Sequence, residues 1–260
     1  MYNSGGSAIL LNVLFTENQA DEGGAIYHSG TGLTLRNVTI AGNSATSGQG
    51  EGVYVASTNT PITAINTILA GNGAEDFRRY SSSTSAMSIT HSLVERQGNA
   101  GLTDGVDGNL VGHDPRFVDP ADPDGPDDAL ATEDDGLVLG PGSPALDAGT
   151  NAALDLDGDG TADLTTDVTG GARLRDNDGD PETAPRVDMG AYEAPAGTVL
   201  PVELAGFEAQ LAGEAVILAW QTASETNNAG FEVQARRSEG TEAGAWQTLA
   251  FVEGAGTTSE

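Results

Sequence analysis

Two aspartate-rich loops in the middle of the chain have the spacing of calcium ligands. In the first, acids recur at alternate positions and once more four residues on, and a glycine stands where a calcium loop turns sharply: Asp155, Asp157, Asp159, Gly160 and Asp163. Alternate residues of a tight loop can converge on one hard cation. Thr166 holds the twelfth position, where a bidentate acid is expected, so that ligand would have to come from elsewhere.

The second loop starts in the same way, with Asp176, Asp178 and Asp180, but Pro181 replaces the glycine. Either loop could also be a solvated turn, because Asp and Gly are typical turn residues. We predict Ca²⁺ as the cofactor of this chain, with the first loop as the better match.

Other catalytic patterns are weak. Three histidines, His28, His91 and His113, have no ligand spacing, and the basic pair Arg78-Arg79 is typical of a solvated turn. No phosphate-binding loop or zinc motif is present. The sequence therefore predicts a protein that is not an enzyme.

A repeat in the first hundred residues indicates the architecture of this part of the chain. The pattern Asn12-Val-Leu-Phe-x-x-Asn18 returns 25 residues later from Asn37, again 29 residues later from Asn66, and in altered form 25 residues after that from His91. A unit of this length cannot bury its own apolar face, so it must stack on its neighbours.

The repeat also aligns apolar side chains in columns, separated by polar residues with a period of two, which is typical of strands. The columns are Ala8, Leu33, Ile62, Met87; Leu10, Leu35, Ala64, Ile89; Phe15, Ile40, Leu69, Val94; and Tyr2, Tyr27, Tyr54. We predict an all-β protein with a parallel β-helix in residues 1–98. The recurring asparagines should form amide ladders at two corners, although Asn also favours turns.

The predicted outward lane of this β-helix carries no acid or base: Ile9, Thr34, Thr63 and Ser88. Polysaccharide lyases and hydrolases built on β-helices place paired carboxylates, or acids with a base, on such a face. This lane therefore supports the prediction that the chain is not catalytic.

Composition narrows the range of partners. The formal net charge is −29, all ten bases are Arg, and there is no Cys. Nucleic acid would be repelled by such a charge. No apolar run reaches the roughly 20 residues of a transmembrane helix, so we predict no transmembrane segment, and a monomer.

The segment 99–196 is rich in acids and loops, and we predict that it caps the coil. Two lanes of outward apolar residues need cover: Leu11 and Ile65 in one, Leu14, Ile68 and Leu93 in the other. We expect part of residues 110–193 to pack over one lane, using the sparse apolar residues Phe117, Val118, Leu137, Leu139, Leu146, Val187 and Tyr192.

The segment 199–260 predicts strands at 203–210, 215–221, 230–237 and 245–252. Four strands are too few for a β-sandwich of about seven. We therefore expect an incomplete sandwich, unstable by itself, in which Trp220, Phe231 and Trp246 are poorly buried.

Each segment also resembles a known family. Glu22-Gly-Gly-Ala-Ile-Tyr27, followed by Asn37-Val-Thr-Ile-x-x-Asn43, resembles the repeats of polymorphic outer-membrane proteins and related surface proteins. This resemblance implies a right-handed parallel β-helix of the pectin lyase-like fold. Asp114-Pro-Arg-Phe117, Ser143-Pro-Ala-Leu-Asp147 and Asp188-Met-Gly-Ala-Tyr-Glu193 resemble the choice-of-anchor Q segment of bacterial surface proteins. The stretches from Leu200 to Phe207 and from Trp220 to Gln234 resemble a fibronectin type III-like module of type IX-secreted proteins.

These resemblances imply an extracellular protein, or one on the outer surface of a Gram-negative bacterium. They imply a non-catalytic stalk or adhesin fragment with an extracellular glycan or surface protein as partner. Because Tyr2 already matches Tyr27, we expect further rungs upstream. The alternative is the C-terminal part of a polysaccharide-binding or polysaccharide-degrading β-helix enzyme whose active rungs lie upstream.

Overall fold

The computed structural model describes residues 1–175, 185–195, 202–213, 215–236, 238–239, 242–243 and 247–259. They belong to two compact units: one contains the described residues up to 195, and the other those from 202 onwards.

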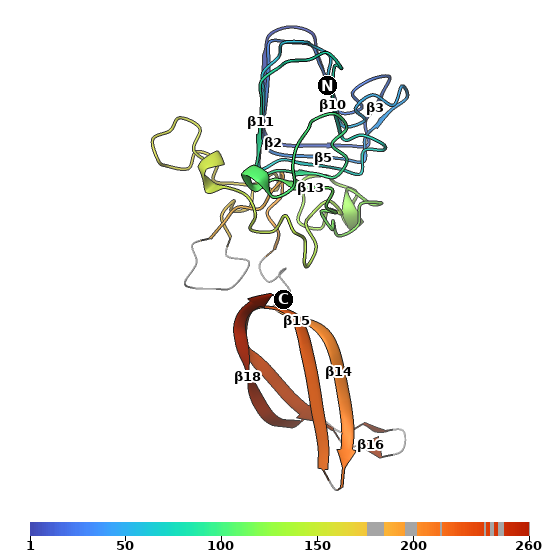
Figure 1. Ribbon diagram of the computed structural model, residues 1–260, viewed down its shortest axis with the longest axis vertical. Coiled ribbons are helices and arrows are strands. Elements are labelled where there is room, and N and C mark those ends of the chain that lie inside the picture. The colour runs from blue at the N-terminus through green and yellow to red at the C-terminus, as the bar shows by residue number, and fades with distance from the viewer. Residues whose placement is uncertain are drawn as a thin grey trace. The chain divides into compact units, whose positions relative to one another are not determined.

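The first unit is built on a parallel β-solenoid of about four turns (Figure 1). One sheet contains β1 (Tyr2–Asn3), β4 (Ile26–His28), β7 (Val53–Val55) and β10 (Phe77–Arg79). Another contains β2 (Ser7–Thr16), β5 (Gly32–Ala41), β8 (Ile62–Ile65), β9 (Ile68–Ala70), β11 (Met87–Thr90), β12 (Leu93–Val94) and β13 (Leu110–Val111). A short pair joins β3 (Gln19–Ala20) and β6 (Ser44–Ala45).

The register of the solenoid confirms the predicted columns. Leu35 pairs with Leu10 on one side and with Ala64 on the other, and Ala64 pairs with Ile89. The inward columns form one buried core, whereas Ile9 of the predicted outward lane is exposed. The first hundred residues therefore stack as the repeat predicts.

The Asn12 lane is a corner of the coil at which the backbone is left-handed. Asn12, Asn37 and Asn66 have φ of 50°, 51° and 50°, a region that Asn tolerates better than most residues. Only one bond between neighbouring amides forms here, from Asn66 Nδ2 to Asn37 Oδ1 at 3.0 Å. The predicted continuous ladder is wrong at this corner, because the amides of Asn12 and Asn66 also bond to later loops, at Thr166 O and Thr150 O.

The Asn18 lane forms the predicted ladder. Asn18 Nδ2 donates to Asn43 Oδ1 at 2.9 Å, and Asn43 Nδ2 donates to Asn72 Oδ1 at 2.8 Å. The ladder ends on buried Asp76, whose Oδ1 accepts from Asn72 Nδ2 at 2.9 Å. Gln97, which follows in the repeat, bonds to the backbone of Leu102 instead.

The coil continues one strand beyond the predicted limit near Gly98. In β13, Leu110 pairs with Leu93 and Val111 pairs with Val94. Ala100 and the partly buried Leu102 pack against the end of the core. The loop between the last two strands therefore closes this end of the solenoid, and its residues from 99 onwards belong to the segment that we predicted to cap the coil.

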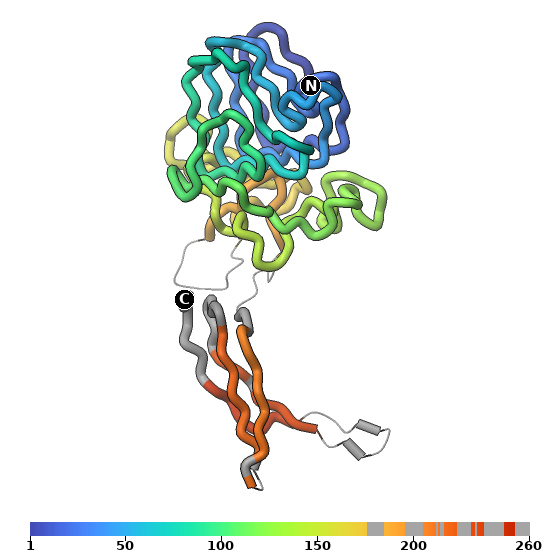
Figure 2. Tube along the Cα trace, turned by 45° about the vertical axis from the view of Figure 1, so that its right-hand side comes forward, coloured from blue at the N-terminus to red at the C-terminus, as the bar shows by residue number. Residues whose placement is uncertain are grey.

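We call the described residues 112–175 and 185–195 the cap. The cap contains two short 3₁₀ helices, η2 (Gly125–Asp127) and η3 (Asn151–Ala153), and η1 (Val106–Gly108) precedes it. Its segments follow the last rung in the chain, and Figure 2 colours them from green to orange.

The cap packs over the second predicted lane. Ile68 and Leu93 share a buried cluster with Leu139 and Met189, and partly buried Leu14 packs against Leu137 and Tyr192 in a neighbouring cluster. This confirms the expected lateral contact. Of the seven residues expected to provide it, Leu137, Leu139, Val187 and Tyr192 are buried, whereas Val118 is exposed because Phe117, beside it, points into the clusters.

The second unit is one antiparallel sheet of β14 (Val202–Ala212), β15 (Ala215–Ala235) and β18 (Gln247–Ser259), beside a small hairpin of β16 (Ser238–Glu239) and β17 (Glu242–Ala243). The strands predicted at 215–221 and 230–237 are wrong as separate elements, because β15 runs through both and takes up the irregular residues between them in register shifts. Trp220 and Phe231 are half-buried, as expected, with ring centroids 5.3 Å apart. Trp246 lies outside the described residues.

Candidate functional site

The first aspartate loop brings three of its four predicted ligands together. Asp155, Asp157 and Asp159 each offer a carboxylate oxygen, and these oxygens lie within 4.8 Å of one another. Asp163 does not join them, because its carboxylate accepts a hydrogen bond from the Leu156 N–H at 2.7 Å and closes the loop. The structure therefore places three of the predicted ligands close enough to share an ion and the fourth apart from them, and metal binding stays a prediction.

The electrostatics of this loop partly suit a cation. Asp155 accepts hydrogen bonds from the N–H groups of Gly160 at 2.8 Å and Gly158 at 2.7 Å, and these bonds hold its pKa below the usual value. The carboxylate thus stays ionised, but part of its lone-pair capacity is already used. Three carboxylates also supply fewer than the roughly six oxygens that Ca²⁺ requires. The residues fit a weak site completed by water.

We expect Ca²⁺ at about ten times its dissociation constant to raise the melting temperature of the first unit by a few degrees. Asp157→Asn should remove this increase, since it deletes one of three charges. Scanning calorimetry with Ca²⁺, and with Mg²⁺ as the control, measures the effect. An equal shift in the variant would rule out this loop.

The second loop, with Asp176, Asp178 and Asp180, lies outside the described residues. A cluster that the sequence analysis missed contains Asp127, Asp134 and Asp135. Asp135 is buried and accepts hydrogen bonds from Ala131 N, Thr132 Oγ1 and the Tyr192 hydroxyl. These bonds give Asp135 a structural role in the cap.

A buried charged network in the cap was also missed. The Arg173 side chain is fully buried and donates hydrogen bonds to the carbonyls of Gly190 and Ala191. Its Nε lies 3.7 Å from Glu193 Oε2, too far for a hydrogen bond. Two more buried acids, Asp167 and Asp188, act on the same guanidinium through their charges. We call these four residues the cap seam.

Two of the three seam acids tie together loop segments that are distant in sequence. Asp188 accepts from Asp147 N at 2.7 Å and from Ala194 N at 2.8 Å. Asp167 accepts from Glu193 N at 2.9 Å and from Gly171 N at 3.0 Å. The stretch from Asp188 to Glu193 stood out in the sequence, but the stretch Gly170-Gly-Ala-Arg-Leu-Arg175 gave no sign that Arg173 is buried.

The seam has more acids than it can keep ionised. Burial, and then the charge of Asp188, raise the pKa of Glu193 to about 9. Burial also raises the pKa of Asp188 to about 6, against the opposing effect of its backbone hydrogen bonds. Because Arg173 bonds mainly to carbonyls, its attraction does not offset the burial of Glu193, and the proton stays on Glu193 at neutral pH.

This proton links the stability of the first unit to pH. The folded pKa of Glu193 lies above its unfolded value, so the stabilisation is complete below about pH 4.5 and is lost as the pH rises towards 9. We expect the free energy of unfolding to fall by up to about 1.4 kcal/mol per pH unit in this window. Urea unfolding at several pH values measures the slope.

Glu193→Gln mimics the protonated acid, so it should remove most of that slope and match the original chain near pH 5. Glu133→Gln, at an exposed acid of the cap, serves as the matched control. Parallel pH curves for the original chain and for Glu193→Gln would show that Glu193 does not hold the proton.

The outward lane of the solenoid has the predicted register, Ile9 to Thr34 to Thr63 to Ser88. The histidines are dispersed. His28 is buried in the coil with neither ring nitrogen hydrogen-bonded, and its burial lowers its pKa, whereas His113 pairs with exposed Asp104 at 3.0 Å. This geometry gives none of the three a shared ligand role.

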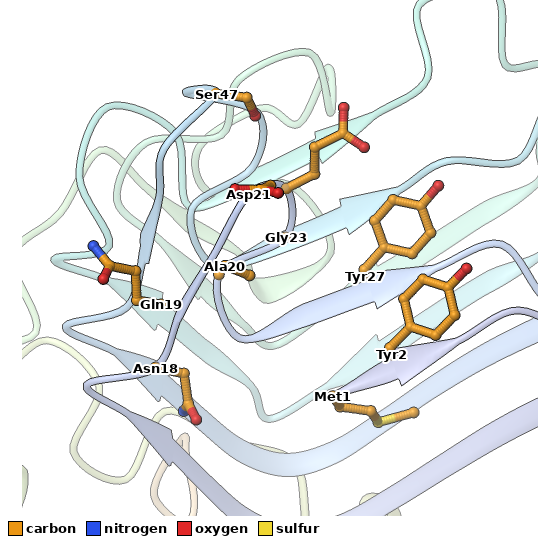
Figure 3. Close-up of a pocket in the computed structure, with 11 residues that line it drawn as sticks. Met1, Tyr2, Asn18, Gln19, Ala20, Asp21, Gly23, Tyr27 and Ser47 are labelled. Atoms are coloured by element: carbon orange, nitrogen blue, oxygen red, sulfur yellow. The ribbon is translucent and has the colours of Figure 1, made fainter.

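A groove of about 750 Å³ opens beside the tyrosine column. Figure 3 shows the rings of Tyr2 and Tyr27 lying parallel, with the turn around Asp21 and Gly23 beside them. The two ring centroids are 5.1 Å apart with 17° between the planes. Polar side chains from two turns complete the lining: Asn18, Gln19, Asp21, Glu22 and Ser47. From the sequence, the column was expected as a packing feature only.

No family model, curated protein or solved structure matches the chain. Within the described residues, no helix combines the length and apolar character needed to span a bilayer.

Proposed function

We propose that this chain is a non-catalytic β-helix module of a secreted or cell-surface protein, a stalk or adhesin. The outward strand lane supports this best, because Thr34, Thr63 and Ser88 are placed in register where an enzyme of this architecture would need acids or a base. The cap also supports it, because the cap seam and the apolar contacts along one side of the coil stabilise the fold.

The remaining assignments extend this proposal. The β-helix rungs, which run from β1 to β13, are followed by the cap, which belongs to a choice-of-anchor Q-like segment, and by a partial fibronectin type III-like module in 199–260. It is located outside a Gram-negative cell or on its surface, after type IX secretion. Ca²⁺ stabilises the cap at Asp155, Asp157 and Asp159, whose oxygens lie close enough to share one ion.

The alternative is the C-terminal part of an enzyme that binds or degrades polysaccharide. Under this alternative, the catalytic rungs lie upstream and the present chain contributes binding.

Two measurements test the proposal. Incubation of the full chain with pectate, alginate, chitin and cellulose should release no reducing ends or unsaturated products above buffer. Protease treatment of intact source cells, followed by an antibody against the chain, should remove the signal. Product formation would favour the enzyme, and a fully protected signal would contradict the surface location.

A further inference from the structure

We infer that His28 makes the coil sensitive to acid: below neutral pH, protonation of its ring favours an opened form of the rung that contains it. This inference goes beyond the proposed function, because it gives the module a regulatory device. It depends on three observations: the burial of the ring, the lack of a hydrogen-bond partner for its nitrogens among the described residues, and the uncharged surroundings.

The His28 ring is enclosed inside the second rung of the solenoid. His28 is 0% exposed, and its strand, β4, lies between β1 and β7, where Asn3 and Val55 are its register partners. The turn at Gly30 packs on the ring: a Cβ added at Gly30 would come within 3.2 Å of His28 Nε2 and 2.2 Å of the Gly6 carbonyl oxygen. The backbone therefore closes directly over the ring edge.

Neither ring nitrogen of His28 has a hydrogen-bond partner among the described residues. A neutral imidazole carries one N–H donor and one acceptor, so both are unsatisfied inside the coil. Buried groups of this kind are rare in folded proteins, because burial also removes them from water. Packing does not require histidine here, since the next rung has the buried apolar residue Val55 at the same position. Neither hydrogen bonding nor packing therefore accounts for a histidine in this place.

A protonated ring in the closed coil would face no compensating charge. The register partners of His28 in β1 and β7 are uncharged, and the turns at 4–6, 29–31 and 56–60 contain no titratable side chain. The tyrosine column runs along the same strands but points to the other side of the sheet, because successive residues alternate. Arg79, the base in the same column, lies beyond Val55. Burial is accordingly the cause that lowers the pKa of His28.

Opening of this rung must therefore depend on pH. The closed coil holds the ring neutral, whereas the opened form exposes it to water, where the pKa of histidine is about 6.5. Because the pKa in the closed form lies below this value, the stabilisation is complete above about pH 6.5 and is lost as the pH falls. The opened population should rise by up to about tenfold per pH unit in this window. Glu193 acts in the opposite direction, since its stabilisation is lost as the pH rises.

Native-state hydrogen exchange of the full chain, between about pH 7.5 and pH 5, tests the inference. The amides of Ser29 and Ala56 report on the rung, because they donate to the carbonyl oxygens of Asn3 and His28 at 2.8 Å. After correction for the intrinsic exchange rate at each pH, their protection should fall by up to about tenfold per unit below pH 6.5. His28→Leu retains a buried side chain of similar size without a titratable group, so it should remove this loss.

Exposed His113 provides the matched control. His113→Leu removes a titratable ring at the surface, beside Asp104, and should leave the pH dependence at Ser29 and Ala56 unchanged. Nuclear magnetic resonance of the histidine rings gives a second readout, in which the His28 signals of the closed coil should not shift with pH. This readout uses the original chain and decides the matter even if His28→Leu does not fold.

Three results would overturn the inference. They are a His28 ring that is protonated in the closed coil without loss of protection, an equal loss of protection in His28→Leu, and protection that does not change with pH in the original chain. None of these outcomes alters the cleavage and location tests of the proposed function.

Discussion

Replacing Arg173 with methionine is expected to destabilise the first unit by about 3–5 kcal/mol. The guanidinium is fully buried and donates to the carbonyls of Gly190 and Ala191. Its loss leaves these carbonyls without a donor and leaves the buried charges of Asp167 and Asp188 without their cation. Removing one partner of a buried charged group is far more costly than removing a surface pair.

Arg175→Met is the matched control for this prediction. Arg175 pairs with the exposed Glu133 at 3.3 Å, so its loss should cost no more than about 1 kcal/mol. Urea unfolding followed by far-ultraviolet circular dichroism gives both values. Hydrogen exchange of residues 185–191 should rise in the Arg173 variant only. Similar free energies for the two variants would show that the seam does not hold the cap.

Replacing Asn72 with alanine should cost about 3–4 kcal/mol, from several net hydrogen bonds and the unpaired groups left behind. Asn72 Nδ2 donates to Ile40 O, Ala70 O and Asp76 Oδ1, and its Oδ1 accepts from the backbone and side chain of Asn43. All of these groups are buried beside the core, where water cannot replace the lost partner. Asp76 is also buried, which raises its pKa, so the loss of the hydrogen bond from Asn72 adds to the free-energy cost.

Asn18→Ala removes the exposed end of the same ladder and should cost about 1 kcal/mol. The ratio of the free-energy costs of the two variants therefore distinguishes the buried centre of the ladder from its solvated end. Chemical denaturation monitored by circular dichroism measures both, and hydrogen exchange at the Asn43 amide reports the local opening. Equal costs at Asn18 and Asn72 would contradict a ladder whose strength comes from burial.

The solenoid could be predicted because its information is periodic. Leu10, Leu35, Ala64 and Ile89 recur at similar intervals, and a strand register that aligns one such set aligns all the others. The Asn18 ladder followed for the same reason, since like side chains stacked at about 4.8 Å can bond to one another. A repeated pattern averages over local irregularity, so a few altered residues in the fourth copy did not obscure it.

The cap and its sites could be predicted only in part. The sequence showed that Leu14, Ile68 and Leu93 needed cover, but two lanes were available and only the fold decided between them. Likewise, the spacing of the aspartates predicted four ligands in one loop. The carboxylate of Asp163 instead accepts a hydrogen bond from Leu156 N and does not join the other three.

The sequence by itself determined the stacked register, the apolar columns and the charge of this protein. Only the tertiary structure decided that Arg173 is buried among acids, that Glu193 holds a proton, and that a groove opens beside Tyr2. The physical reason is that stacking depends on side chains of one type repeated at fixed separations. The seam and the groove depend instead on single contacts between loops far apart in the chain, and no periodic signal encodes such contacts.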